Sequence, residues 1–140
     1  MVDRARLDQL LALLERYVTI LRRLSAIPLG EFIDDPRNYG SAERFLQLAI
    51  ETALSIGNHV IADAGFDQPD TYADIIVVLG KRGVLDPELA TALRPMARMR
   101  NRLVHHYADL AAERVHEIIL TRLGDFDRFA EQITTHADRS

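Results

Sequence analysis

The sequence predicts an all-α protein of four long helices and one short helix. Apolar residues recur at helical spacing along the long segments. Serine or aspartate caps precede several of these segments, and glycines follow some of them. The apolar run at residues 75–79 resembles a strand, but no second segment offers it a pairing partner. We therefore expect that run to lie in the short helix.

The first long helix is expected from about Asp3 to Ser25. Leu7, Leu14 and Leu21 repeat every seven residues, so they lie on one apolar stripe. This stripe belongs either to the core or to a dimer interface. Two prolines and two glycines then follow between Ile27 and Gly40, and they predict a break between helices.

The second long helix is expected to start at Ser41, a favourable N-cap, and to end at Asp63 or Ala64, before Gly65. Its apolar face includes small residues, and another helix can approach the backbone closely at such positions. These small residues are Ala49, Ala53 and Gly57.

The short helix is predicted from Thr71 to Leu79. A third long helix should begin at Asp86-Pro87-Glu88, where an aspartate cap precedes a proline suited to the first helical position. Pro95 interrupts this helix and is expected to kink it, because proline supplies no backbone donor.

The last long helix is predicted from Leu110 to about Thr135, with Asp109 as its cap. Residues 134–140 form a polar tail that is expected to fray. The length of the chain fits a single domain spanning residues 1–140.

The composition excludes several kinds of site and segment. The absence of cysteine excludes disulfides and thiolate metal sites. Charged residues interrupt the N-terminal segment, so no signal pattern is visible, and no apolar run approaches the roughly 20 residues of a membrane span. We expect a cytoplasmic protein that does not associate with membranes.

Charge is unevenly distributed along the chain. The formal net charge is −4, but the stretch from Lys81 to Tyr107 carries six basic and two acidic residues. This stretch is therefore locally +4, which leaves −8 on the remainder of the chain. The basic stretch either attracts phosphate or is an ordinary solvated helix face.

The octet from Arg100 to Tyr107 places an arginine, an asparagine, two histidines and a tyrosine at the end of the third long helix. On an ideal helix Arg100 lies among apolar side chains, and Tyr107 lies about 20° away. A buried guanidinium needs an anionic partner or a polar groove. Arg100 is therefore either a structural residue tied to a carboxylate or part of a functional site. The histidines could instead stabilise a helix end, and Tyr107 could be a core-edge aromatic.

Candidate partners for Arg100 lie on the polar face of the second helix. Arg44, Glu51 and Asn58 are spaced seven residues apart and share that face. The face either points to solvent or lets Glu51 or Asn58 contact Arg100.

The arginine, four residues, histidine, one residue, tyrosine pattern of the octet resembles the HepT-like branch of the HEPN proteins. The segment from Arg44 to Asp63 and the helix start at Thr71-Tyr72 resemble the same family in order and spacing. The resemblance spans roughly residues 5–135. It implies an antiparallel helical bundle that forms a two-fold dimer.

The resemblance also implies a ribonuclease toxin that a cognate nucleotidyltransferase antitoxin holds in check. By position, Arg100 and His105 would act on RNA in a cleft between subunits, and the antitoxin would adenylylate Tyr107. Asn101 matches the polar residue that follows the arginine. An alternative is a non-catalytic helical partner of the nucleotidyltransferase that binds nucleotide or presents substrate.

The chemistry of the octet suits RNA cleavage without a metal. His105 is expected to transfer protons near neutral pH, and Arg100 is expected to bind the scissile phosphate. Asn101, one turn earlier, would orient His105. The histidines at 105, 106 and 116 lack recognised metal-ligand spacing, so we expect neither a metal nor another cofactor.

Overall fold

The computed structural model describes residues 3–105 and 111–139, and the regular structure in these ranges is helical. These residues form α1 (Arg4–Ser25), α2 (Leu29–Asp34), α3 (Pro36–Ala64), α4 (Tyr72–Lys81), α5 (Pro87–His105), α6 (Ala112–Thr121) and α7 (Leu123–Asp138). The all-α prediction is confirmed. The predicted count of five helices is wrong, because the described residues form seven.

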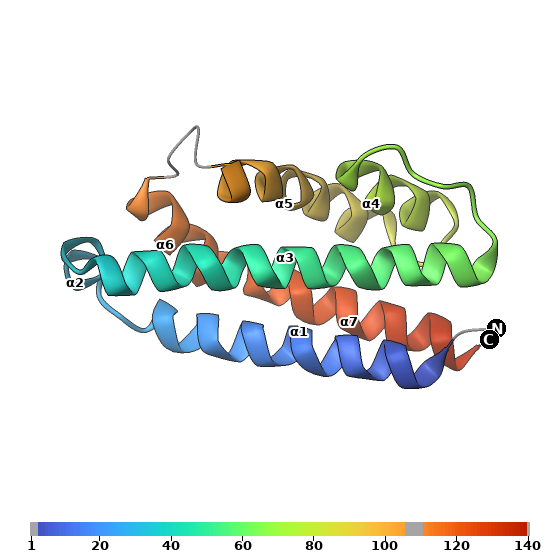
Figure 1. The fold of residues 1–140 in the computed structure, drawn as a ribbon, viewed down its shortest axis with the longest axis horizontal. Coiled ribbons are helices and arrows are strands. Elements are labelled where there is room, and N and C mark those ends of the chain that lie inside the picture. Colours follow the sequence, from blue (N-terminus) through green and yellow to red (C-terminus); the bar gives the residue numbers. More distant parts are fainter. Residues whose placement is uncertain (1–2, 106–110, 140) are drawn as a thin grey trace.

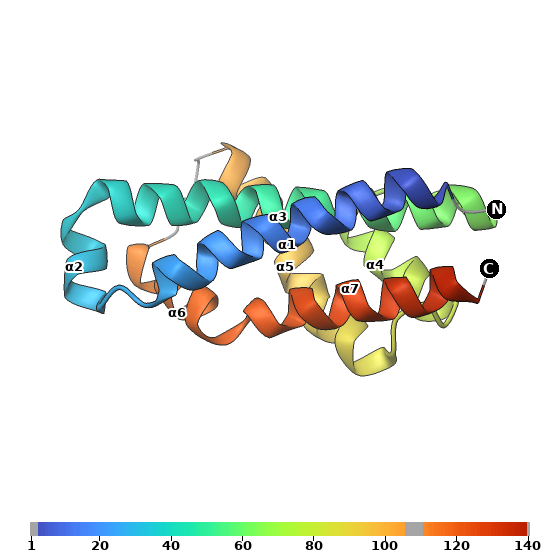
Figure 2. The same cartoon turned by 90° about the horizontal axis from the view of Figure 1, so that it is seen from below.

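The long helices pack side by side in alternating directions (Figure 1). α3 lies between α1 on one side and α5 on the other, and it runs antiparallel to both. α7 completes the bundle by contacting α1 and α5, and Figure 2 shows it running alongside α1. The start of α1 and the end of α7 lie at the same end of the bundle.

The α1 stripe is core. Leu7, Leu14 and Leu21 have at most 1% of their surface exposed, so the seven-residue spacing predicts the buried face correctly. Asp3 caps the helix by accepting a hydrogen bond from the backbone N–H of Arg6 at 3.1 Å.

The predicted break from Ile27 to Gly40 is wrong over most of its length. α2 occupies part of it, and α3 begins at Pro36 instead of Ser41. The prolines sit where helices begin: Pro28 is the N-cap of α2, and Pro36 is at the start of α3 behind the Asp35 cap. Phe32 is fully buried, and this burial holds the short α2 against the bundle.

The second predicted helix ends as expected, at Ala64, where Gly65 adopts a left-handed φ of 70°. Close approach is confirmed at Gly57. A Cβ there would lie 2.6 Å from Ile75 Cγ2 and 3.1 Å from Leu79 Cδ1 of α4. Residues 75–79 are helical, as predicted, and Ile75 and Leu79 pack directly on the α3 backbone.

α3 passes a length and composition test for a membrane-spanning helix, with a mean hydropathy of 1.2 over its most apolar window. In the bundle, 56% of that window is buried against other helices. This burial is typical of the core helix of a globular protein.

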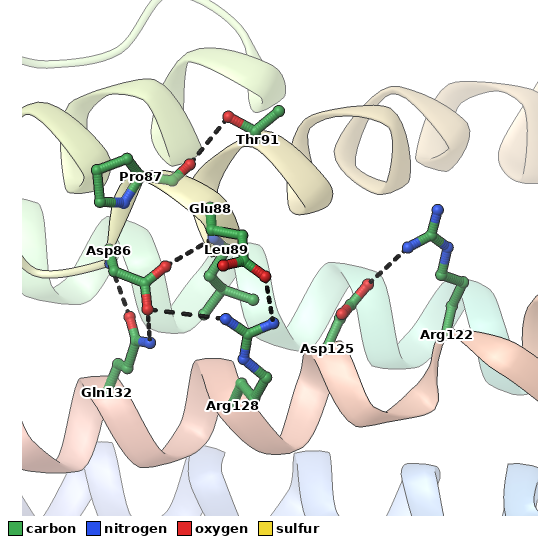
Figure 3. A network of polar contacts seen from close by, with 9 residues as sticks. All are labelled: Asp86, Pro87, Glu88, Leu89, Thr91, Arg122, Asp125, Arg128 and Gln132. Atoms are coloured by element: carbon green, nitrogen blue, oxygen red, sulfur yellow. Dashed lines mark hydrogen bonds and ion pairs between the residues drawn. The ribbon is translucent and has the colours of Figure 1, made fainter.

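The start of α5 is fixed to α7 by a polar network around Asp86 (Figure 3). The Asp86 carboxylate accepts hydrogen bonds from the Leu89 N–H at 2.7 Å and from Gln132 Nε2 at 2.6 Å. The Gln132 side-chain carbonyl accepts from the Asp86 N–H at 2.8 Å, and Arg128 lies 3.7 Å from the same carboxylate. This network positions the helix that carries the octet.

The predicted last helix is divided in two. α6 ends at Thr121, and α7 starts at Leu123 after a turn at Arg122. Both parts contact α1, but α6 also contacts α2 and α3, whereas α7 also contacts α5.

The polar tail does not fray where it was predicted to. α7 continues to Asp138, Ala137 is buried, and Arg4 Nη1 lies 2.8 Å from Asp138 Oδ1. The proposed cap Asp109 lies outside the described residues.

Candidate active site

Arg100 lies near the end of α5, where its guanidinium contacts side chains from three helices. Nη2 donates to Glu51 Oε2 of α3 at 3.3 Å, and Nη1 donates to Asn101 Oδ1 at 3.3 Å. The guanidinium carbon lies 4.5 Å from the centre of the Tyr72 ring at the start of α4. This arrangement combines a carboxylate with a cation–π contact around one arginine.

The Arg100 site is at the edge of the core. Met96 and Leu103 are buried on either side of Arg100, whereas its own side chain is 19% exposed and that of Glu51 is 33% exposed. Arg100 Nε is buried and has no hydrogen-bond partner among the described residues. Glu51 and Asn101 therefore hold the two terminal nitrogens of the guanidinium, while the ion pair keeps partial contact with solvent.

The structure brings Glu51 and Arg100 together, and it gives Asn58 a different environment. Glu51 also accepts a hydrogen bond from Gln47 Nε2 at 3.2 Å, which restricts its side chain further. Asn58 is exposed two turns along α3, and no hydrogen bond joins it to Arg100 within the described ranges. The α3 polar face is thus partly a solvent face and partly a wall of the Arg100 site.

Asn101 contacts Arg100 directly, because its side-chain oxygen accepts a hydrogen bond from Arg100 Nη1 at 3.3 Å. The predicted orientation of His105 by Asn101 stays a prediction. The side chain of His105 and residues 106–110, including Tyr107, lie outside the described residues. His105 is the last residue of α5, five positions after Arg100, which corresponds to about 140° around the helix axis.

Tyr72 is the residue that sequence reasoning missed. The Thr71-Tyr72 pair marks a helix start, and Thr71 caps α4 by accepting from the Asp74 N–H at 3.1 Å. Tyr72 is 40% exposed and stacks on a guanidinium carried by another helix. Only the placement of α4 against α5 reveals this contact, because the two residues are far apart in sequence.

One of the three histidines outside the octet, His116, has a structural position. His116 is buried, its Nε2 lies 2.9 Å from the Ile27 carbonyl oxygen, and its ring packs edge-on against Phe32. It therefore joins α6 to the start of α2. Over the residues that the structure describes, no three His, Asp or Glu side chains gather into a potential metal-binding group.

Comparison with known proteins identifies the family. The model of the ribonuclease HepT-like family matches residues 13–133. The tRNA nuclease HepT of Aphanizomenon flos-aquae is 30% identical over 126 residues, covering 90% of this chain and 86% of that protein. The mRNA nuclease HepT of Shewanella oneidensis is 27% identical over 88 residues, covering 63% and 66% of the two chains.

The fold agrees with the family. A tri-AMPylated HEPN toxin from Shewanella oneidensis, solved in complex with the MNT antitoxin, superposes with a TM-score of 0.86 at 23% identity. The superposition covers 96% of this chain and 99% of the toxin. The chain therefore belongs to the ribonuclease HepT-like family, as its octet predicts, and it is an enzyme of the ribonuclease class.

Proposed function

We propose that this protein is the toxin of a toxin–antitoxin pair and that it cuts RNA without a metal ion. The observation that carries this proposal is the half-buried Arg100 at the edge of the core, held by Glu51 and Tyr72 within the family motif. Each terminal nitrogen of the guanidinium makes one hydrogen bond and carries a second N–H, so donors are left for a phosphate. Family membership favours this function over a non-catalytic partner role.

The reaction is transesterification at phosphorus. A base, assigned to His105, removes the proton of the 2′-hydroxyl, and the resulting oxygen attacks the adjacent phosphorus. Arg100 stabilises the charge that develops on the phosphorane oxygens. The bond to the 5′-oxygen breaks as that oxygen receives a proton. The products are a 2′,3′-cyclic phosphate and a 5′-hydroxyl.

The active site is proposed to lie between two copies of the chain. About 140° of helix rotation separates the backbone positions of Arg100 and His105, so their side chains leave α5 on different faces. A two-fold dimer could place Arg100 of one copy opposite His105 of the other. Asn101 is proposed to support this geometry by holding Arg100.

The nucleotidyltransferase partner is proposed to neutralise the toxin by adenylylating Tyr107. The solved relative is an AMPylated HEPN toxin bound to its antitoxin, which supports this assignment. Tyr107 lies two residues beyond His105 in the sequence, so an AMP group there would add bulk and negative charge close to the RNA site. The pair is proposed to act in the cytoplasm, without a membrane.

Cleavage chemistry tests the proposed function directly. Purified protein is incubated with total RNA in EDTA, beside Arg100→Ala and His105→Ala. We expect the wild-type protein alone to cut, and its products to carry cyclic phosphates. Strict dependence on added magnesium, or linear 3′-phosphates from the first time point, would contradict the mechanism.

Intact mass measurement tests the proposed modification. Incubation with the partner and ATP should add one or more AMP units to the wild-type protein and stop cleavage. Tyr107→Phe should gain none, whereas Tyr39→Phe, a change at a half-buried tyrosine of α3, should be modified normally. Equal modification of Tyr107→Phe would place the acceptor elsewhere.

A further inference from the structure

The outer face of α5 carries three exposed arginines. Arg94, Arg98 and Arg102 follow one another at four-residue intervals, so they form one row along the helix, with about 6 Å of rise between neighbours. We refer to these three residues as the α5 arginine stripe.

The stripe has no compensating charge. From Leu89 to His105 the sequence contains four arginines and no aspartate or glutamate. Within the described part of the chain, none of the three stripe residues makes an ion pair, although seven other arginines do. The paired residues are Arg4, Arg22, Arg37, Arg100, Arg114, Arg122 and Arg128.

Folding does not explain this arrangement. Like charges four residues apart on a helix repel one another and destabilise it. The side chains are exposed, so they contribute little packing to the core. The row of unpaired cations therefore costs helix stability and adds no packing in return. Residues that oppose folding in this way are often functional.

The stripe leads to the end of α5 that carries the motif. Its residues lie about 120–200° around the axis from Arg100, on the side away from the Glu51 contact. His105 follows Arg98 by seven residues, so its backbone position falls within about 20° of Arg98. The row of positive charge therefore runs along α5 toward the residue assigned to proton transfer.

We propose that the α5 arginine stripe binds the phosphodiester backbone of RNA and guides the strand toward His105. This inference rests on the proposed ribonuclease function. Guanidinium groups bind phosphate oxygens bidentately and independently of base sequence. With aromatic residues at 6% and no tryptophan, the chain offers few stacking platforms for bases, so backbone contacts should supply most of the affinity.

The test replaces the stripe with R94Q/R98Q/R102Q and measures RNA binding by fluorescence anisotropy. The probe is a labelled 2′-O-methyl RNA of about 20 nucleotides, longer than the roughly 4–16 nucleotides of common single-strand sites. It lacks the attacking hydroxyl and stays intact. We expect Kd to rise about tenfold or more, and the slope of log K against log salt to weaken by about 0.7 per lost phosphate contact.

The matched control is R6Q/R16Q/R23Q on α1. These arginines are also exposed and make no ion pair among the described residues. Their substitution removes the same formal charge as the stripe variant. α1 lies on the opposite side of α3 from α5 (Figure 1). We expect this control to keep most of the RNA affinity. Glutamine preserves helix propensity, so neither variant should melt earlier than the wild-type protein.

Several outcomes would contradict the proposed role of the α5 arginine stripe. Unchanged binding by R94Q/R98Q/R102Q, or an equal loss in the α1 control, would show that the row has no special role. Loss of self-association or of antitoxin binding, with RNA affinity intact, would make the row a protein interface instead. Parallel cleavage of total RNA separates the two proposals. If the wild-type protein cleaves RNA and the stripe variant binds RNA as tightly, only the stripe proposal is rejected. If the wild-type protein neither binds nor cleaves RNA, both proposals are rejected.

Discussion

At the scale of single residues, the proposed activity depends on the environment of Arg100. Glu51 neutralises much of its charge, yet the pair is only partly buried, with 19% and 33% of the two side chains exposed. In such an environment the carboxylate contributes orientation more than stability, because solvent screens the ion pair. We interpret Glu51 and Tyr72 as positioning residues that aim one guanidinium at a phosphate.

Glu51→Gln should slow RNA cleavage by about tenfold, equivalent to about 1.4 kcal/mol of transition-state stabilisation. The amide keeps the shape of the side chain but loses the charge that fixes the guanidinium, so kcat should fall more than KM rises. Initial-rate kinetics on a defined RNA measure this. Glu15→Gln on α1, at an exposed glutamate, should leave the rate unchanged. A Glu51→Gln protein as fast as wild type would remove the positioning role.

Tyr72→Phe should retain nearly full activity, and Tyr72→Leu should lose several-fold, because the aromatic face contacts the guanidinium and the hydroxyl does not enter the argument. The same kinetic assay compares the two variants. Equal losses in both would assign the effect to the hydroxyl instead of the ring.

At the scale of elements, close helix contacts and helix caps hold α5 in place. α4 packs on α3 at Gly57 and on α5 at Gly80, where a Cβ would lie only 2.9 Å from Ala90 Cβ. α4 therefore joins the helix that carries Glu51 to the helix that carries Arg100. The Asp86 network then fixes the start of α5 to α7.

Gly57→Ala should destabilise the protein by roughly 1–3 kcal/mol, because the new methyl group meets Ile75 at 2.6 Å in a packed core. Gly40→Ala is the matched control. It lies in the same helix, a Cβ there meets nothing within 4 Å, and we expect it to stabilise by up to about 1 kcal/mol. Urea unfolding followed by circular dichroism measures both. A stable Gly57→Ala protein would mean that α4 can move away without cost.

Asp86 predicts part of the acid sensitivity. The hydrogen bond from the Leu89 N–H, followed by that from Gln132, lowers the pKa of Asp86 below its usual value. A lowered folded-state pKa gives stability that is complete above the unfolded value, about 3.9, and is lost as pH falls through the folded value. The melting temperature should therefore decrease when the pH is lowered below about 4.

Asp86→Asn keeps a capping side chain but removes the charge. It should lower the midpoint at pH 7 and flatten its decline in acid, as measured by thermal melts across pH. Asp67→Asn, at an exposed aspartate beyond the end of α3, should leave the acid profile unchanged. A profile for Asp86→Asn that matches wild type would exclude Asp86 as a contributor.

The sequence predicts the buried stripes and most caps because these depend on neighbours within one or two turns. The Leu7–Leu21 stripe, the Gly65 stop and the Asp86 start are of this kind. Pro28 and Pro36 lie where helices begin and not in a break, because proline opposes a helix interior but suits its first turn. The helical end at Asp138 depends on Ala137 reaching the core, which local polarity cannot indicate.

At the scale of the whole molecule, the candidate site depends on three helices distant in sequence. Regular spacing on α3 offers Glu51 or Asn58 as a partner for Arg100, because helical periodicity predicts which residues share a face. The structure shows that the partner is Glu51. Tyr72 could not be found that way, since its contact depends on how α4 packs against α5. The separation of Arg100 and His105 around α5 is the basis of our proposal that two copies of the chain share the active site.

Complementation between inactive variants tests this central claim most directly. Arg100→Ala and His105→Ala are each assayed alone on RNA, and then after mixing, unfolding and refolding so that copies exchange. If Arg100 of one copy acts with His105 of the other, each variant alone is inactive. Random pairing makes about half of the dimers mixed, each with one intact site, so the mixture should recover about a quarter of wild-type activity. Undiminished cleavage by either variant alone would contradict the account, and a mixture that stays inactive would contradict the shared site.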